Sequence, residues 1–213
     1  MENIDHWRRL FREKARVLYP SSDPSHDFLH ICRVVETAQR LAIEEGANIA
    51  VVMPAAYFHD FVNVPKDDPR RKEASRLSSK AAVEYLREVG YSEPLFPAIA
   101  HAIEAHSFSA NITPETIEAK IVQDADRLDG LGAIGIARCF STSTLLRRPY
   151  YCPEDPWAEN RSVDDIAFAI DHFPAKLFKV AETMQTQAAS KEAARRVAFM
   201  RGFLAQLGQE ISG

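Results

Sequence analysis

The sequence predicts an all-α fold, and three observations support this prediction. Apolar residues recur at helical spacing along most of the 213-residue chain. Glycine is scarce, with 8 residues, and the alternating β-branched stretches typical of hairpins do not occur. The one Asp-Gly pair, Asp129-Gly130, lies in a run of small apolar residues instead of between strands. We expect a single helical domain over residues 1–213, with its core at about 20–145 and additional C-terminal helices at about 163–213.

The expected helices of the first half are bounded by prolines, glycines and capping residues. They span about 3–18, 25–45, 48–60 and 73–89, with a fifth that starts at Pro94 or Pro97 and ends at about His106. Gly46 is expected to be the C-cap of the second helix, and Asn48 the N-cap of the third. Pro54 should lie near the first turn of that third helix, which would move the helix start beyond Asn48. The polar residues 63–73 are expected to form a loop.

In the second half, Thr113-Pro114-Glu115 predicts a helix start, with a cap, a proline and an acid in order. The glycine- and alanine-rich run that ends at Phe140 predicts helices that pack very closely. A proline-rich loop is expected at 147–163 and helices from there to about 210, with a break at Pro174.

Composition narrows the function classes. Hydrophobic residues make up 46% and charged residues 26% of the chain, and the formal net charge is −4. These values give no electrostatic drive toward nucleic acid or anionic membranes. Three widely spaced cysteines argue against a disulfide framework. Without a signal peptide or a membrane-spanning stretch, the expected localisation is cytoplasmic, with no nucleic-acid and no membrane partner.

Metal-competent side chains occur at helical positions in four places. These are His30 with Arg33, His59-Asp60, His101 with Glu104 and His106, and Asp124-Ala125-Asp126. His59-Asp60 ends an apolar run, and burying these two side chains is costly unless they are paired. A divalent cation would pair the carboxylate and take the imidazole nitrogen. The alternative is a helix end with solvated polar residues, so the metal hypothesis needs ligands that converge from separate helices.

Several motifs of the chain resemble one known family. They are His30-x-x-Arg33-Val34, Ala55-Ala56-Tyr57-Phe58-His59-Asp60, His106-Ser107-Phe108-Ser109, and the long run Val122-Gln123-Asp124-Ala125-Asp126-Arg127-Leu128-Asp129-Gly130-Leu131-Gly132 with its continuation to Arg138. They are similar to motifs of the HD-domain metal-dependent phosphohydrolases, and most similar to the bacterial YedJ/YpgQ-like subgroup. The resemblance covers about 20–190 and implies an HD-type helical bundle.

The resemblance implies that the metal ligands are His30, His59, Asp60 and Asp126. Two neutral imidazoles and two carboxylates would neutralise a divalent cation, for which Mn, Mg, Fe, Co, Ni or Zn are the candidates. Asp124 and Asp126 point about 200° apart on a regular helix, so only one should face the metal. Spacing leaves that choice open, and the resemblance favours Asp126.

Further residues are candidates for catalysis or substrate binding. Asp60, Asp124 and Asn63 are the catalytic candidates; Asn63 stands where some HD nucleotidases carry Glu, and it cannot act as a base. Cationic or hydrogen-bonding candidates for substrate are Arg33, Lys66, Arg71, Lys72, His101, His106 and Arg127. For these the alternatives are a solvated charge run, a core histidine or a structural salt bridge.

The expected function is an enzyme, a metal-dependent phosphohydrolase that acts on a small phosphorylated substrate. The resemblance implies a nucleotide, with pyrophosphohydrolysis of a nucleoside triphosphate favoured. The alternatives are a phosphodiesterase or 5′-nucleotidase of the same fold, or a non-catalytic nucleotide-sensing module. The expected partner is the substrate, and a homodimer is a further alternative.

Overall fold

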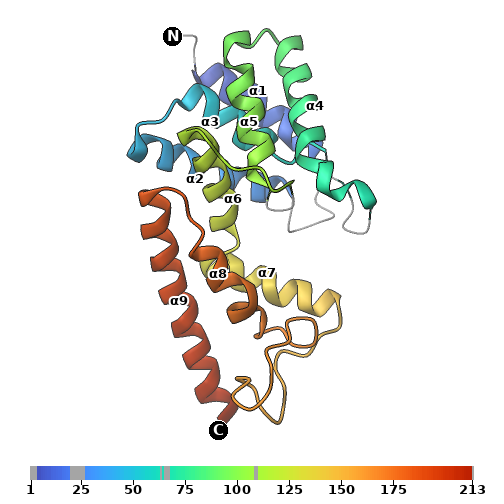
Figure 1. Ribbon diagram of the computed structural model, residues 1–213, viewed down its shortest axis with the longest axis vertical. Coiled ribbons are helices and arrows are strands. Elements are labelled where there is room, and N and C mark those ends of the chain that lie inside the picture. The colour runs from blue at the N-terminus through green and yellow to red at the C-terminus, as the bar shows by residue number, and fades with distance from the viewer. Residues whose placement is uncertain (1–3, 20–26, 63, 65–67, 108–109, 213) are drawn as a thin grey trace. The chain divides into compact units, whose positions relative to one another are not determined.

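The structure is a computed structural model, and within the residues it describes all regular elements are helical (Figure 1). Those residues are 4–19, 27–62, 64, 68–107 and 110–212. The predicted all-α fold is confirmed. By packing, the chain divides into two compact units, Met1–Asp126 and Arg127–Gly213. The single domain expected from the sequence stays a prediction, because this division describes packing and not independent folding.

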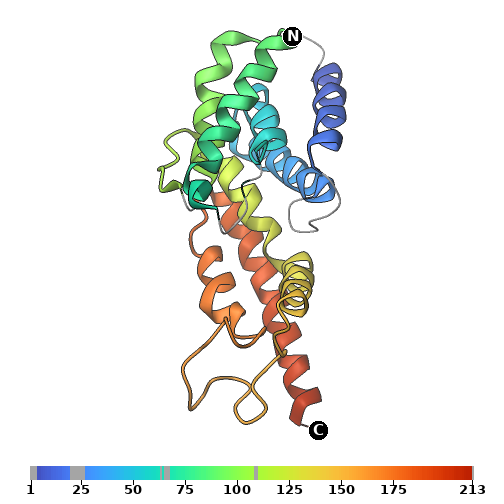
Figure 2. The same cartoon turned by 90° about the vertical axis from the view of Figure 1, so that its right-hand side faces the viewer.

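The first unit contains the predicted helices of the N-terminal half. They are α1 (Ile4–Leu18), α2 (Phe28–Glu45), α3 (Ile49–Phe58), the 3₁₀ turn η1 (Pro69–Glu73), α4 (Ala74–Glu88), η2 (Glu93–Leu95), α5 (Phe96–His106) and most of α6 (Ile117–Asp129). The central helix is α3, which packs against α1, α2 and α5. Figure 2 shows α3 between the α1–α2 pair and the α4–α5 pair. Every residue of α3 from Val51 to Phe58 is buried, which explains its apolar composition on all sides.

The start of α3 confirms one prediction and corrects another. Asn48 is the N-cap, and its side chain accepts a hydrogen bond from Ala50 N–H at 3.0 Å. Pro54 nevertheless lies inside the helix, not in its first turn. A proline cannot donate to the carbonyl four residues earlier, which here belongs to Ala50. The Tyr91 hydroxyl donates to that carbonyl oxygen at 2.7 Å, so the missing helical bond is replaced from a distant part of the chain.

The start of α6 differs from the prediction at Thr113. The helix begins one full turn later, where the Thr116 hydroxyl accepts a hydrogen bond from Ala119 N–H at 3.2 Å. The N–H of Glu115, which a cap at Thr113 would have bonded, donates instead to His101 Nε2 at 3.0 Å. The cap is therefore Thr116.

The second unit is built around one long helix. Its elements are α7 (Gly132–Leu145), the π-helical turn η4 (Phe173–Leu177), α8 (Phe178–Ala181) and α9 (Gln187–Ser212), and α9 packs against α7 and α8. The close packing predicted from the glycines is confirmed in part: a Cβ on Gly135 would collide with the carbonyl oxygen of Gly130. That crowding is between α7 and the turn that precedes it. Two helices also approach closely, since a Cβ on Gly132 of α7 would lie 3.2 Å from Cγ of Arg196 on α9.

The irregular segment predicted at 147–163 continues to Asp171, so the expectation of helix from 163 onward is wrong. Local hydrogen bonds explain the extension. Asp171 accepts from the Arg161 guanidinium, at 2.9 Å on its Oδ1, and from Asp164 N–H at 2.7 Å. Asp164 Oδ1 in turn accepts the backbone N–H groups of Ile166 and Ala167, both at 3.0 Å. These bonds satisfy the backbone without a helix. None of the helices in the described ranges is long and apolar enough to cross a membrane.

Candidate metal centre

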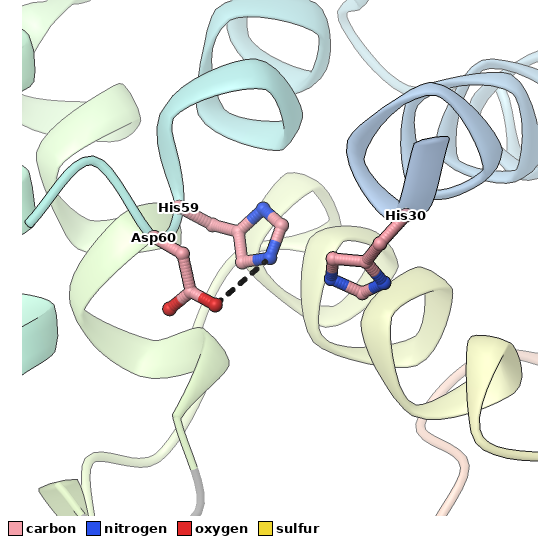
Figure 3. Close-up of side chains that lie close together, drawn as sticks. All are labelled: His30, His59 and Asp60. Atoms are coloured by element: carbon pink, nitrogen blue, oxygen red, sulfur yellow. Dashed lines mark ion pairs between the residues drawn. The ribbon is translucent and has the colours of Figure 1, made fainter. Parts of the chain in front are cut away.

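Helix ends bring together three of the predicted ligands. Asp27 caps α2 by accepting the N–H of His30 at 2.8 Å, which places His30 in the first turn. His59 is the C-cap of α3, and Asp60 follows it. The candidate ligand atoms of His30, His59 and Asp60 lie within 4.8 Å of one another. Figure 3 shows the two imidazole rings and the carboxylate facing a common space.

The tautomer of His59 leaves a lone pair on Nε2 that could bind a metal ion. Its Nδ1 lies 2.9 Å from the carbonyl oxygen of Ala56, so Nδ1 carries the proton and Nε2 keeps its lone pair. The ring is fully buried, and among the described residues Nε2 has no hydrogen-bond partner. Burial lowers the pKa of His59, against the opposing effect of the Asp60 charge. A buried neutral imidazole with an unsatisfied nitrogen fits a metal ion.

The carboxylate of Asp126, on α6, completes the cluster from a third helix. Its Oδ1 lies 3.5 Å from His30 Nε2 and 3.8 Å from His59 Nε2. The Asp60 Oδ2 atom also lies 3.8 Å from His59 Nε2 (Figure 3). Asp126 is 32% exposed, whereas Asp124 is fully buried. The distances therefore favour Asp126 over Asp124 as the ligand left open by spacing.

A third histidine, His106, joins the same cluster. Its Nδ1 donates to the carbonyl oxygen of Ile103 at 2.6 Å, and its Nε2 lies 3.5 Å from Asp60 Oδ1. Its ring centroid is 4.9 Å from that of His59. Burial acts to lower the pKa of His106, but the hydrogen bond and charge of Asp60 outweigh it, and the pKa is raised. The sequence made His106 a candidate for substrate phosphate or for a second metal, and the structure places it beside a predicted metal ligand.

Other predicted site residues have structural partners. The Arg71 guanidinium donates to Val64 O at 2.6 Å, and His101 accepts from the backbone as described above. In the second unit, Arg127 donates to the carbonyl and the hydroxyl oxygens of Thr183. Their substrate roles stay predictions.

Arg33 lies half-buried on α2, one turn beyond His30, and Lys72 lies at the end of η1; their substrate roles are also untested. Asn63 and Lys66 lie outside the described residues. Asp129, which follows Asp126 by three residues in the same motif, is buried and forms an ion pair with Arg138 at 2.8 Å.

Two neighbours of the cluster were missed by sequence reasoning. Tyr19 is buried, and its hydroxyl donates to Tyr57 O at 3.0 Å. Burial and then the charge of Asp60 raise its pKa well above the usual value, so the end of α1 lies close to the cluster. Gln123 is buried one turn before Asp126, and its amide donates to the carbonyl oxygen of Ala105 at 2.7 Å. The i, i+3 spacing of Gln123 to Asp126 was the available signal.

Comparison with known proteins adds independent findings. A model of the HD domain family matches residues 27–131, a segment that contains every residue of the cluster. The YpgQ protein of Bacillus subtilis (strain 168) is 32% identical over 192 residues, which cover 88% of this chain and 85% of YpgQ. The crystal structure of B. subtilis YpgQ in complex with ADP is similar with a TM-score of 0.75 and 30% identity, over 97% of this chain and 95% of that chain. The structure of an HD-superfamily hydrolase from Bacillus thuringiensis gives a TM-score of 0.78 and 31% identity, over 99% and 100% of the two chains.

Proposed function

Because the chain belongs to the HD-domain superfamily of metal-dependent phosphohydrolases, and within it to the YpgQ-like subgroup, we propose that its substrate is a nucleotide. The favoured reaction is hydrolysis of a nucleoside triphosphate to the monophosphate and diphosphate. The observation that carries the proposal is the buried, unsatisfied Nε2 of His59 beside two carboxylates and a second imidazole. The ADP complex of YpgQ supports a nucleotide as ligand.

In this proposal the metal ligands are His30, His59, Asp60 and Asp126. Two imidazoles and two carboxylates suit a divalent cation of the first transition row or Mg²⁺. A bound divalent cation would supply Lewis acidity toward a phosphoryl oxygen and would acidify a water molecule for attack. The carbonyl oxygen of Ala56 fixes the tautomer of His59, which orients this ligand from outside the cluster.

His106 has a positioning role in this proposal. Its Nδ1 proton is committed to the Ile103 carbonyl, so a hydrogen bond from Nε2 to Asp60 requires a protonated ring. A cationic His106 would hold the Asp60 carboxylate in place and would place positive charge beside the phosphate groups.

The reaction balances without a further co-reactant. A water oxygen bonds to the α-phosphorus, the bond from that phosphorus to the bridging oxygen breaks, and diphosphate leaves with the electron pair. The water gives up a proton in the same process. Asn63 cannot take that proton. Asp124 is fully buried and points about 200° away from Asp126, so its proposed role is to orient a ligand histidine from outside the cluster.

The proposal is tested by product analysis. Chelator-stripped protein is reloaded with Mn²⁺, Mg²⁺, Co²⁺, Ni²⁺, Fe²⁺ or Zn²⁺ and incubated with nucleoside tri-, di- and monophosphates and with cyclic nucleotides. ³¹P NMR then identifies the products. Diphosphate with monophosphate supports the proposal. Free phosphate from a monophosphate indicates a 5′-nucleotidase, opening of a cyclic nucleotide indicates a phosphodiesterase, and tight nucleotide binding without any product indicates a sensing module.

A further inference from the structure

The carbonyl groups in the last turn of α3 accept hydrogen bonds from donors outside the helix. The carbonyl oxygens of Ala56 and Phe58 pair with donors within residues 59–61, at 2.9 Å and 3.1 Å. The carbonyl oxygen between them, on Tyr57, accepts the Tyr19 hydroxyl at 3.0 Å. Carbonyl groups at a helix end have no partner within the helix, so their donors fix how the chain leaves it. Tyr19 supplies one of these donors from a distant part of the chain, the end of α1.

The Tyr19 hydroxyl also lies beside Asp60. Tyr19 is 5% exposed, and its bond to Tyr57 is buried. Burial raises the pKa of Tyr19 most, the charge of Asp60 raises it further, and a hydrogen bond with the Asp60 backbone acts to lower it. The phenol therefore contacts both the last turn of α3 and the backbone of a predicted metal ligand.

The position of Tyr19 is fixed by the packing of α1 on α3. Its backbone N–H donates to the carbonyl oxygen of Ala15 at 3.0 Å, so Tyr19 continues the geometry of α1. The fully buried ring of Phe11, on α1, lies 5.2 Å from the ring of Phe58 and 6.1 Å from that of Tyr57, between centroids. The helix that carries Tyr19 is thus anchored on the same turn of α3 that the hydroxyl bonds.

His59 and Asp60 project from the chain directly after this turn (Figure 3). Without the Tyr19 hydroxyl, the carbonyl of Tyr57 loses a buried donor, and the peptide group can rotate to find another. Such a rotation moves the two residues that follow. Groups that hold metal ligands in place contribute to metal affinity although they do not touch the ion.

We propose that Tyr19 is a positioning residue of the metal centre: its hydroxyl ties α1 to the last turn of α3 and so holds His59 and Asp60 in the geometry that binds the metal ion. This proposal rests on the metal site of the proposed function. It adds an element to that site, because α1 and Tyr19 precede residues 27–131, the segment that matches the HD domain family.

The experiment compares Tyr19→Phe with Tyr91→Phe. Each substitution removes only a hydroxyl group from a tyrosine that is 5% exposed and donates to a carbonyl of α3. Tyr91 bonds the carbonyl of Ala50, at the opposite end of α3 from the ligands, so Tyr91→Phe is a matched control. Both variants should have a lower urea midpoint than the wild type, because each loses one buried hydrogen bond.

Mn²⁺ binding separates the two variants. In calorimetric titrations of chelator-stripped protein, Tyr19→Phe should bind Mn²⁺ about 10-fold more weakly than the wild type, as expected for a group that orients ligands. Tyr91→Phe should bind Mn²⁺ like the wild type. Helical circular dichroism at the temperature of the titration checks that both variants are folded.

The outcomes distinguish the positioning role from the proposed function. If the wild type binds Mn²⁺ about 10-fold more tightly than Tyr19→Phe but hydrolyses no nucleotide, the positioning role stands and the proposed function fails. If the wild type hydrolyses nucleoside triphosphate and the two variants have equal affinity for Mn²⁺, the function stands and the positioning role is refuted. That equality shows that the Tyr19 hydroxyl contributes to stability alone.

Discussion

Asp60→Asn tests the metal cluster most directly. The substitution keeps the shape of the side chain but removes one of the two negative charges that would neutralise a divalent cation. Asp60 Oδ2 lies 3.8 Å from His59 Nε2 and Oδ1 lies 3.5 Å from His106 Nε2, so one change acts on two histidines. Removing a group that only orients a ligand costs about 10–100-fold in metal affinity. Loss of a ligand should exceed this, so we expect metal affinity to fall more than about 100-fold.

The assay combines metal content with turnover. Chelator-stripped wild type and Asp60→Asn are titrated with Mn²⁺, bound metal is measured by mass spectrometry, and hydrolysis is followed with the best nucleotide. Asp165→Asn is the matched control, because Asp165 forms a similar pair with His172, at 2.9 Å, in the second unit. Helical circular dichroism should be the same in all three proteins. Asp60→Asn protein that binds Mn²⁺ and turns over like the wild type would refute the metal site proposed above.

Three further predictions concern stability. Asp171→Asn should lower the free energy of unfolding in urea titrations, because it removes the carboxylate that pairs with Arg161 and accepts the Asp164 N–H. Burial acts to raise the pKa of Asp171, but the hydrogen bonds from Arg161 outweigh it and the pKa is lowered. The stability contributed by the Asp171 carboxylate is therefore present above pH about 4. Further acidification should remove it in the wild type but not in the variant. Tyr91→Phe should cost about 1–2 kcal/mol, because it removes the donor to the carbonyl of Ala50, and an unchanged urea midpoint would contradict this. Gly135→Ala should lower the thermal midpoint more than Gly202→Ala does, since a Cβ at 135 collides with backbone and one at 202 meets nothing.

The sequence predicted the elements of the first unit well because their boundaries depend on neighbouring residues. Asn48 caps α3 through the next backbone amides, and Gly46 ends α2 with a φ of 69°. The errors have long-range causes. Pro54 is tolerated inside α3 because Tyr91 compensates, and the Glu115 N–H that the predicted cap at Thr113 would bond donates to the distant His101 instead. No local pattern reports such partners.

The site residues also divide into those whose neighbours could be predicted from the sequence and those whose partners could not. The proximity of His30, His59 and Asp60 could be predicted, because the motif brings together side chains that are costly to bury apart. The partners of Arg127 and Asp129 could not be predicted, because a charged residue next to a metal motif can contact either the substrate or another residue of the protein. Here the contacts are with Thr183 and Arg138. Whether Arg127 also meets substrate stays a prediction.

His59 and His106 are oriented by the same kind of hydrogen bond, from Nδ1 to a carbonyl oxygen near the end of a helix. The last four carbonyl groups of a helix have no intrahelical partner. The carbonyls of Ala56 in α3 and Ile103 in α5 belong to this set, and each accepts the Nδ1 proton of the histidine three residues later. The bond satisfies the carbonyl, fixes the tautomer and turns Nε2 away from the helix toward the cluster. A histidine at the end of an apolar helix is therefore a stronger sign of a metal site than a histidine in its middle, because the helix end itself supplies the group that orients the ring.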